Sequence, residues 1–184
     1  MRGPSKMLWP KLARGLVSRP LTEPVPSPPA EVVAALAAKL EATGRVRLGR
    51  SLAIRQVDAG SCNGCELEIN AMSGVIYDLE RLGLRFVASP RHADVLLVTG
   101  PVTRNMREAL ERTRASAAEP CWVVAVGDCA VDGGVFKGSY AVEGGVGQVL
   151  PVDLLIPGCP PAPAQILEGL LALLEAQDAP APRG

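Results

Sequence analysis

The sequence predicts an α/β domain, in which an open parallel sheet carries helices on both faces. Two observations predict this fold class. From residue 51 onward, short apolar runs alternate with longer segments of helical pattern. In addition, the run at residues 94–98 is apolar after its first residue, which is typical of a parallel strand buried on both faces. The alternation indicates a flavodoxin-like arrangement.

The same pattern predicts the position of each element. The strands are expected at residues 52–57, 84–88, 94–98, 122–126 and 153–156. The helices of the domain are expected at residues 66–82, 104–118 and 163–176, and a Gly-rich loop at residues 132–147.

An irregular N-terminal arm precedes the domain. It is basic and rich in proline, which excludes a regular helix or a central strand at its end. Within it, Leu8, Leu12 and Leu16 recur at helical spacing, which indicates either a short amphipathic helix on a membrane surface or partner, or an arm that orders only in a complex. The expected divisions are residues 1–29 for the arm, 30–50 for a helix and linker, 51–177 for the α/β domain and 178–184 for a disordered tail.

Charge and hydropathy exclude several classes of protein. The chain has 19 Lys plus Arg and 19 Asp plus Glu, and few aromatic residues, so we expect no nucleic-acid partner. No apolar stretch is long enough to span a bilayer, and the N-terminus lacks the apolar core of a secretory signal peptide. We therefore expect a reduced, cytoplasmic setting, in which cysteines are more often ligands or buried thiols than disulfides.

Four of the five cysteines follow predicted strands. Cys62 and Cys65 form a C-x-x-C pair after the first strand, Cys129 follows the fourth and Cys159 follows the fifth. The carboxyl ends of parallel strands share one edge of a sheet, where open α/β sheets bind ligands. Four thiolates at one edge are typical of an iron–sulfur site, so we predict that these residues bind such a cluster.

Three other interpretations of the cysteines stay open at this point. Four thiolates also hold structural zinc, although usually as two close pairs. A C-x-x-C pair after a strand and at a helix start is also the arrangement of a thioredoxin-like dithiol, which would leave Cys129 and Cys159 without a role. The third interpretation is that all five are incidental core cysteines.

Three further residues have side chains that could ligate a metal or carry a proton. Cys121 begins the fourth strand, about 26 Å from Cys129 along a straight strand at about 3.3 Å per residue, so we predict a buried structural thiol. His92, the only histidine, precedes the third strand at the edge away from the other cysteines, so we predict a surface role. Glu66 follows Cys65 directly; it either couples electron transfer to proton movement or simply favours the helix N-terminus.

Several motifs, in order, resemble one family. The run from residue 51 to residue 174 is similar to the 20-kDa subunit of complex I and to its relatives, the small subunits of membrane-bound nickel–iron hydrogenases. Complex I subunits carry adjacent cysteines at the opening motif, whereas this chain has two residues between Cys62 and Cys65, as in the formate hydrogenlyase type. The motifs that carry the resemblance are residues 62–66 (CNGCE), 89–94 (SPRHAD), 127–130 (GDCA), 132–134 (DGG) and 152–161 (VDLLIPGCPP).

The resemblance implies an electron-transfer function. It implies one 4Fe–4S cluster on Cys62, Cys65, Cys129 and Cys159, relaying electrons between ferredoxin-like iron–sulfur subunits and a large subunit. That large subunit would be nickel–iron or complex I 49-kDa-like, and membrane subunits would complete the assembly. The chain itself is then expected to be peripheral, on the cytoplasmic side of the inner membrane, as part of an oxidoreductase.

The resemblance leaves the chemistry of the partner open. A nickel–iron large subunit would make the complex a hydrogenase, and such subunits carry two C-x-x-C pairs. A complex I-like module would instead pass electrons to quinone. A third hypothesis is an assembly or scaffold paralogue that keeps the fold for docking, which the presence of all four cysteines disfavours.

Overall fold

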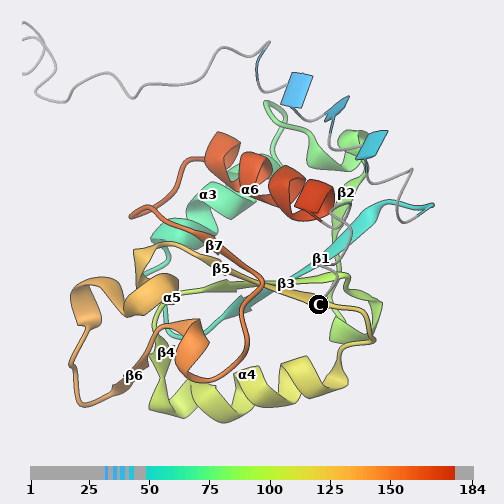
Figure 1. The fold of residues 1–184 in the computed structure, drawn as a ribbon. Coiled ribbons are helices and arrows are strands. Elements are labelled where there is room, and N and C mark those ends of the chain that lie inside the picture. The colour runs from blue at the N-terminus through green and yellow to red at the C-terminus, as the bar shows by residue number, and fades with distance from the viewer. Residues whose placement is uncertain (1–31, 33–34, 37, 40–41, 44–48, 177–184) are drawn as a thin grey trace, which may run out of the picture.

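Five parallel strands form the central sheet of the computed structural model, which describes residues 32, 35–36, 38–39, 42–43 and 49–176 (Figure 1). Their order is β2-β1-β3-β5-β7. In chain order of these strands this is 2-1-3-4-5, the order of flavodoxin-like folds, so the predicted fold class is confirmed. The strands are β1 (Leu52–Asp58), β2 (Leu84–Phe86), β3 (Val95–Thr99), β5 (Trp122–Val126) and β7 (Leu154–Ile156).

Some predictions fall outside the described residues. These are the arm with its helix at Leu8, Leu12 and Leu16, most of the linker segment, and the C-terminal tail. The proposed domain boundaries therefore stay predictions.

Burial explains the apolar runs of the central strands. All five residues of β3 are buried, because β1 and β5 flank it in the sheet and helices cover both of its faces. In the register, Val98 pairs with Val57 of β1 and with Ala125 of β5. A strand enclosed in this way has no solvent face, so it shows no polar alternation in sequence.

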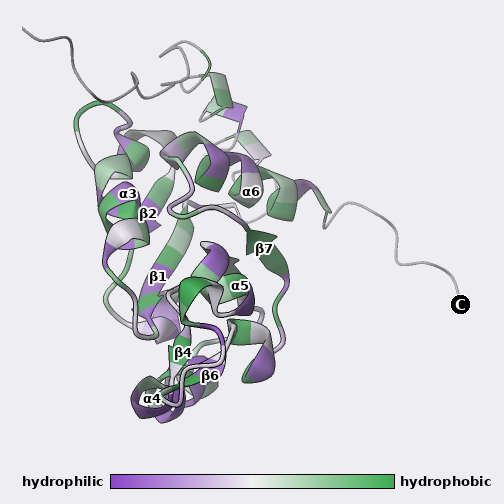
Figure 2. Ribbon diagram, turned by 90° about the vertical axis from the view of Figure 1, so that its left-hand side faces the viewer, coloured by the Kyte–Doolittle hydropathy of each residue, from purple (hydrophilic) through white to green (hydrophobic). Residues whose placement is uncertain are grey.

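Helices cover the two faces of the sheet and create two apolar layers. α3 (Gly64–Met72) and α6 (Pro163–Ala176) lie on one face, and α4 (Arg104–Ser116) lies on the other (Figure 1). α6 buries seven residues, six of them in the apolar layer between α6, α3 and the sheet, whereas α4 buries Leu110 alone. Figure 2 shows the same contrast, with hydrophilic residues prominent along α4. At about 1.5–3 kcal/mol for each fully buried large apolar side chain, α6 is the more strongly anchored helix.

The predicted helix at residues 66–82 is wrong in its extent. α3 ends at Met72, because the N–H groups of Ser73 and Gly74 turn back to the carbonyl oxygens of Asn70 and Ala71, at 3.1 and 3.0 Å. A separate 3₁₀ turn, η1 (Leu79–Leu82), follows. The apolar residues between them, Val75 and Ile76, are exposed, so they did not mark a buried helical face.

The predicted loop at residues 132–147 also has regular structure. It contains the end of α5 (Asp128–Asp132), the 3₁₀ turns η3 (Gly134–Phe136) and η4 (Val146–Gln148), and β6 (Val142–Gly144). β6 pairs antiparallel with β4 (Val102–Thr103), which forms a second, two-stranded sheet. A pairing between segments so far apart leaves no periodic signal in either short strand.

Candidate metal centre

The structure places the four predicted ligands at the carboxyl edge of the sheet. Cys62 lies in the loop after β1, and Cys65 lies in the first turn of α3. Cys129 lies in α5, directly after β5, and Cys159 follows β7. Because β1, β5 and β7 belong to one parallel sheet, cysteines separated by almost a hundred residues meet at the same edge.

The loop that carries Cys62 is held by hydrogen bonds to its own side chains. The carboxylate of Asp58 accepts the N–H groups of Gly60 and Ser61, at 2.8 and 2.7 Å. The hydroxyl of Ser61 then accepts the N–H of Asn63, at 3.1 Å. Asn63 has a φ of 71°, a left-handed conformation that Asn tolerates better than most residues. This sharp turn ends the loop and starts α3 beside Cys65.

Asp128 ties the Cys129 segment to the Cys159 segment. Its N–H donates to the carbonyl oxygen of Gly158, and its carboxylate accepts the N–H of Gly158, both at 2.8 Å. A third bond of 2.8 Å runs from the N–H of Gly127 to the carbonyl oxygen of Ile156. The two ligand-bearing loops are therefore fixed to each other before any metal binds.

Two glycines allow backbone to approach the sulfur atoms closely. A Cβ atom on Gly127, which has a φ of 90°, would lie 2.5 Å from Sγ of Cys65. A Cβ atom on Gly134, with a φ of 50°, would lie 2.8 Å from Sγ of Cys129. Both distances are impossible contacts, so side chains at these positions would displace the thiols.

The thiols influence each other electrostatically. The pKa of Cys65 is raised to about 12, first by burial of the thiol and then by the negative charges of Glu66 and of the other three thiolates. Burial also raises the pKa of Cys129, against a hydrogen bond from the Val135 N–H that lowers it. Several thiolates at one edge repel one another unless cations neutralise them. Without such cations, the protonated form of these cysteines is therefore favoured.

The geometry bears on which metal group the thiols fit. A hollow of about 430 Å³ opens between Cys129 and Cys159. Within the described part of the chain, no three Cys, His, Asp or Glu side chains lie close enough together to hold one metal ion. Cys129 and Cys159 line this hollow together with Asp128 and Asp132. Thiolates are the ligands that iron–sulfur clusters take, so the chemistry of these two cysteines is compatible with such a group.

The interpretation of all five as incidental core cysteines loses support. Incidental core cysteines would be buried, whereas Cys62 and Cys159 are exposed. Cys121 does behave as a core residue: it is 5% exposed and packs in the apolar layer on the α4 face. His92 is exposed in η2 (Pro90–His92), before β3 and at the other edge, as predicted.

Glu66 is buried beside the predicted ligands. Glu66 is only 6% exposed. Neither of its carboxylate oxygens has a hydrogen-bond partner among the described residues. A buried carboxylate in that state is unfavourable unless another group compensates it. The sequence singled out Glu66 by its position but gave no sign of this burial.

Sequence reasoning missed Asp128 as a member of the site. The motif at residues 127–130 indicated Cys129 as a ligand. The role of Asp128 is its hydrogen bond with Gly158, which becomes visible only in the folded chain. Its position directly before a ligand, at a strand end, was the available signal.

Comparison with known proteins identifies the family. A family model described as the 20-kDa subunit of NADH ubiquinone oxidoreductase matches residues 62–173. The chain belongs to this family. The matched residues include the four predicted ligands, Cys62, Cys65, Cys129 and Cys159. The predicted resemblance is therefore confirmed.

Relatives in the 20-kDa subunit family include hydrogenase subunits. Formate hydrogenlyase subunit 7 of Escherichia coli is 43% identical over 174 residues, which cover 93% of this chain and 64% of that protein. The match thus spans less than two thirds of the length of that relative. A probable membrane-bound hydrogenase subunit of Pyrococcus furiosus is 44% identical over 128 residues, covering 70% of this chain and 77% of that one.

Solved structures agree with the fold of the 20-kDa subunit family. A chain of the membrane-bound sulfane sulfur reductase, an archaeal respiratory membrane complex, matches with a TM-score of 0.61 and 31% identity, over 75% of this chain and 74% of that one. A chain of the NiFeSe hydrogenase of Dm. baculatum matches with a TM-score of 0.53 and 16% identity, over 70% and 63%, which supports the fold alone. In the described part of this family member, no helix is long and apolar enough to cross a bilayer.

Proposed function

We propose that this chain is the electron-transfer small subunit of a membrane-associated nickel–iron hydrogenase of the formate hydrogenlyase type. In this proposal Cys62, Cys65, Cys129 and Cys159 bind one 4Fe–4S cluster. The observation that carries it is the convergence of these four thiols, from three strand ends, on one sheet edge. The relatives named as formate hydrogenlyase and membrane-bound hydrogenase subunits support the class of complex.

The cluster, when bound, would accept and release single electrons. The chain's own residues would hold and insulate it. Asp128 holds two ligand loops in register, and Gly127 leaves room beside Sγ of Cys65. Backbone N–H groups near the thiols, such as that of Val135 at Cys129, can donate to sulfur and tune the reduction potential. A proton-coupling role for Glu66 stays a prediction.

Exposure at the carboxyl edge indicates where the large subunit would dock. Cys62 and Cys159 are exposed, so a cluster bound there would be reached from outside the chain. Next to Cys129, the segment after α5 presents Val135 at 80% and Tyr140 at 87% exposure. Exposed apolar side chains around a site are typical of an interface. We therefore propose that the large subunit covers this edge, and that ferredoxin-like and membrane subunits complete the complex.

A second candidate function is a complex I-like module that passes electrons to quinone. The family description, a subunit of NADH ubiquinone oxidoreductase, favours it. The two candidates share the cluster and differ in the partner. The neighbouring large-subunit sequence distinguishes them, because a nickel–iron site requires two C-x-x-C pairs there, and their absence would exclude the hydrogenase.

Anaerobic purification of the chain, with iron and acid-labile sulfide analysis, tests the cluster itself. The proposal expects equal amounts of iron and sulfide, in the stoichiometry of one 4Fe–4S cluster per chain, and an electron paramagnetic resonance signal after reduction. Zinc in place of iron, or a metal-free chain after reconstitution with iron and sulfide, would refute it.

A further inference from the structure

A pocket of about 390 Å³ opens at the amino edge of the sheet, opposite the cysteines. Four basic or potentially basic residues converge on it from separate segments. Arg50 precedes β1, Arg85 lies in β2, and Arg91 and His92 lie in η2. No role in the proposed electron transfer accounts for this concentration of positive charge.

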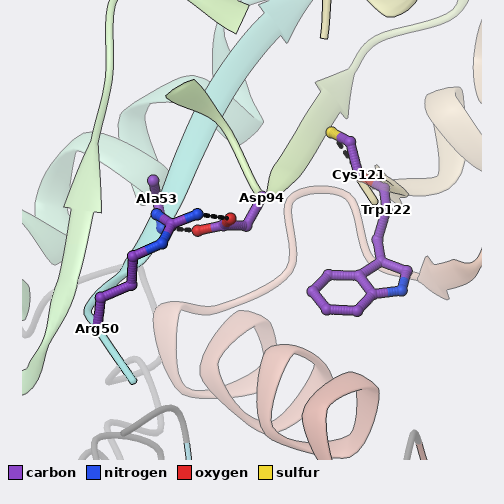
Figure 3. Close-up of polar contacts among 5 residues, drawn as sticks. All are labelled: Arg50, Ala53, Asp94, Cys121 and Trp122. Atoms are coloured by element: carbon purple, nitrogen blue, oxygen red, sulfur yellow. Dashed lines mark hydrogen bonds and ion pairs between the residues drawn. The ribbon is translucent and has the colours of Figure 1, made fainter. Parts of the chain in front are cut away.

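Backbone and side-chain bonds fix the walls of the pocket. The Asp94 carboxylate accepts the guanidinium of Arg50 at 2.5 Å and the N–H of Ala53 at 2.9 Å (Figure 3). The N–H of Trp122 donates to the carbonyl oxygen of Asp94 at 2.9 Å. Figure 3 shows Arg50 and Trp122 on the two sides of Asp94, while the sulfur of Cys121 lies away from them. The pocket is therefore built on the start of three adjacent strands.

Charge pairing leaves two arginines available in this pocket. Asp94 pairs with Arg50, and Glu119 pairs with Arg114 at 2.7 Å. Within the part of the chain that the structure describes, Arg85 and Arg91 form no ion pair. Both acidic residues that line the pocket are thus already neutralised, and the remaining net charge is positive.

We propose that this pocket binds a phosphate-type oxyanion, supplied either by a free phosphate compound or by a phospholipid headgroup. Guanidinium groups present planar, forked N–H donors that match phosphate oxygens. The volume lies in the range of small-molecule sites, and the pocket is concave, which favours a compact anion over an acidic polypeptide. The half-buried indole of Trp122 provides a flat wall against which the non-ionic part of the ligand can pack.

Trp122 also provides a direct readout. The chain has two tryptophans, Trp9 and Trp122, so the Trp9→Phe variant of the full chain reports on the pocket alone. We expect a saturable change in its fluorescence on titration with inorganic phosphate or with vesicles of phosphatidylglycerol and phosphatidylcholine. Calorimetry on the wild-type chain should give the same affinity. Binding of phosphate in solution assigns a free ligand, whereas binding of the anionic vesicles alone assigns a headgroup.

Charge variants test whether the pocket is responsible. Arg85→Gln/Arg91→Gln in the Trp9→Phe chain should weaken binding at least about tenfold, because hydrogen bonds to charged groups are lost. The matched control, Arg104→Gln/Lys137→Gln, removes two exposed positive charges at the other edge and should bind as before. Circular dichroism and thermal unfolding check that both double variants fold.

Three results would overturn the proposal. One is the absence of saturable binding of either probe by the folded wild-type chain. Another is equal weakening in the two double variants, which would indicate general charge attraction. A third is binding to an acidic polypeptide, with the same dependence on Arg85 and Arg91, but not to phosphate or vesicles; this would assign the pocket to a protein partner.

Discussion

Asp128 and Gly158 exchange two hydrogen bonds of 2.8 Å, one through the backbone N–H of Asp128 and one through its carboxylate. The pair joins the segment of Cys129 to the segment of Cys159. The separation of two proposed ligands is therefore set by the protein itself rather than by a bound metal group.

The Asp128→Ala variant should lose stability and hold metal poorly. Removing the carboxylate leaves the Gly158 N–H without its acceptor, which should lower the free energy of unfolding by about 1–3 kcal/mol. Denaturant titration of the metal-free chain measures this loss. Asp128→Asn keeps an acceptor oxygen and should lose less. Equal losses in the two variants would contradict a role for this hydrogen bond.

Cysteine variants separate ligands from the core thiol. Cys129→Ala or Cys159→Ala should abolish the iron signal, because a 4Fe–4S cluster needs all its thiolates for stable binding. Cys121→Ser should retain it, since Cys121 lies in the apolar layer at the start of β5, away from the other four. Iron analysis and electron paramagnetic resonance give the comparison. Loss of the signal in the Cys121 variant would refute the assignment.

Replacing Glu66 should stabilise the metal-free chain. Glu66→Met removes a carboxylate whose oxygens have no partner among the described residues and keeps a side chain of similar length. We expect the free energy of unfolding to rise by about 1–3 kcal/mol. The control is Glu68→Met on the same helix, at a less buried position. A fall in stability for Glu66→Met would show that the carboxylate has a compensating partner after all.

Alkaline pH should destabilise the metal-free chain. An unfolded thiol ionises near its ordinary pKa of 9.0, whereas folded Cys65 ionises at about 12. Above the lower value the unfolded state binds fewer protons than the folded state, so stability falls as the pH rises through this window. Unfolding at about pH 8 and about pH 10, within the range in which thiols ionise, measures the slope. Cys65→Ser should reduce it; an unchanged slope would argue against the raised pKa.

The exposed apolar segment after α5 should be needed for assembly. Val135→Asp places a charge beside the proposed cluster edge, where a partner would have to desolvate it. We expect loss of co-purification with the large subunit, while the isolated chain keeps its thermal stability. Ala115→Asp, on the exposed side of α4, is the control and should assemble normally. Normal assembly of both variants would place the interface elsewhere.

Local patterns predicted most of the sheet. The runs at residues 94–98 and 122–126 match β3 and β5 closely, because strands buried on both faces must be apolar throughout. The end of α3 was not predicted, since Val75 and Ile76 continue the helical pattern but lie in solvent. The pairing of β4 with β6 was missed for a different reason: strands of two and three residues are too short to show a period.

The sequence by itself determined the fold class, the family and the position of each candidate ligand relative to a strand end. Those properties depend on local composition and on motif order, which are present in the chain before it folds. Tertiary structure alone decided that Asp128 bonds to Gly158, that Glu66 is buried with no hydrogen-bond partner in the described part of the chain, and that arginines from three segments share one pocket. Each of these depends on contacts between residues distant in sequence, and such contacts exist only when the sheet is formed.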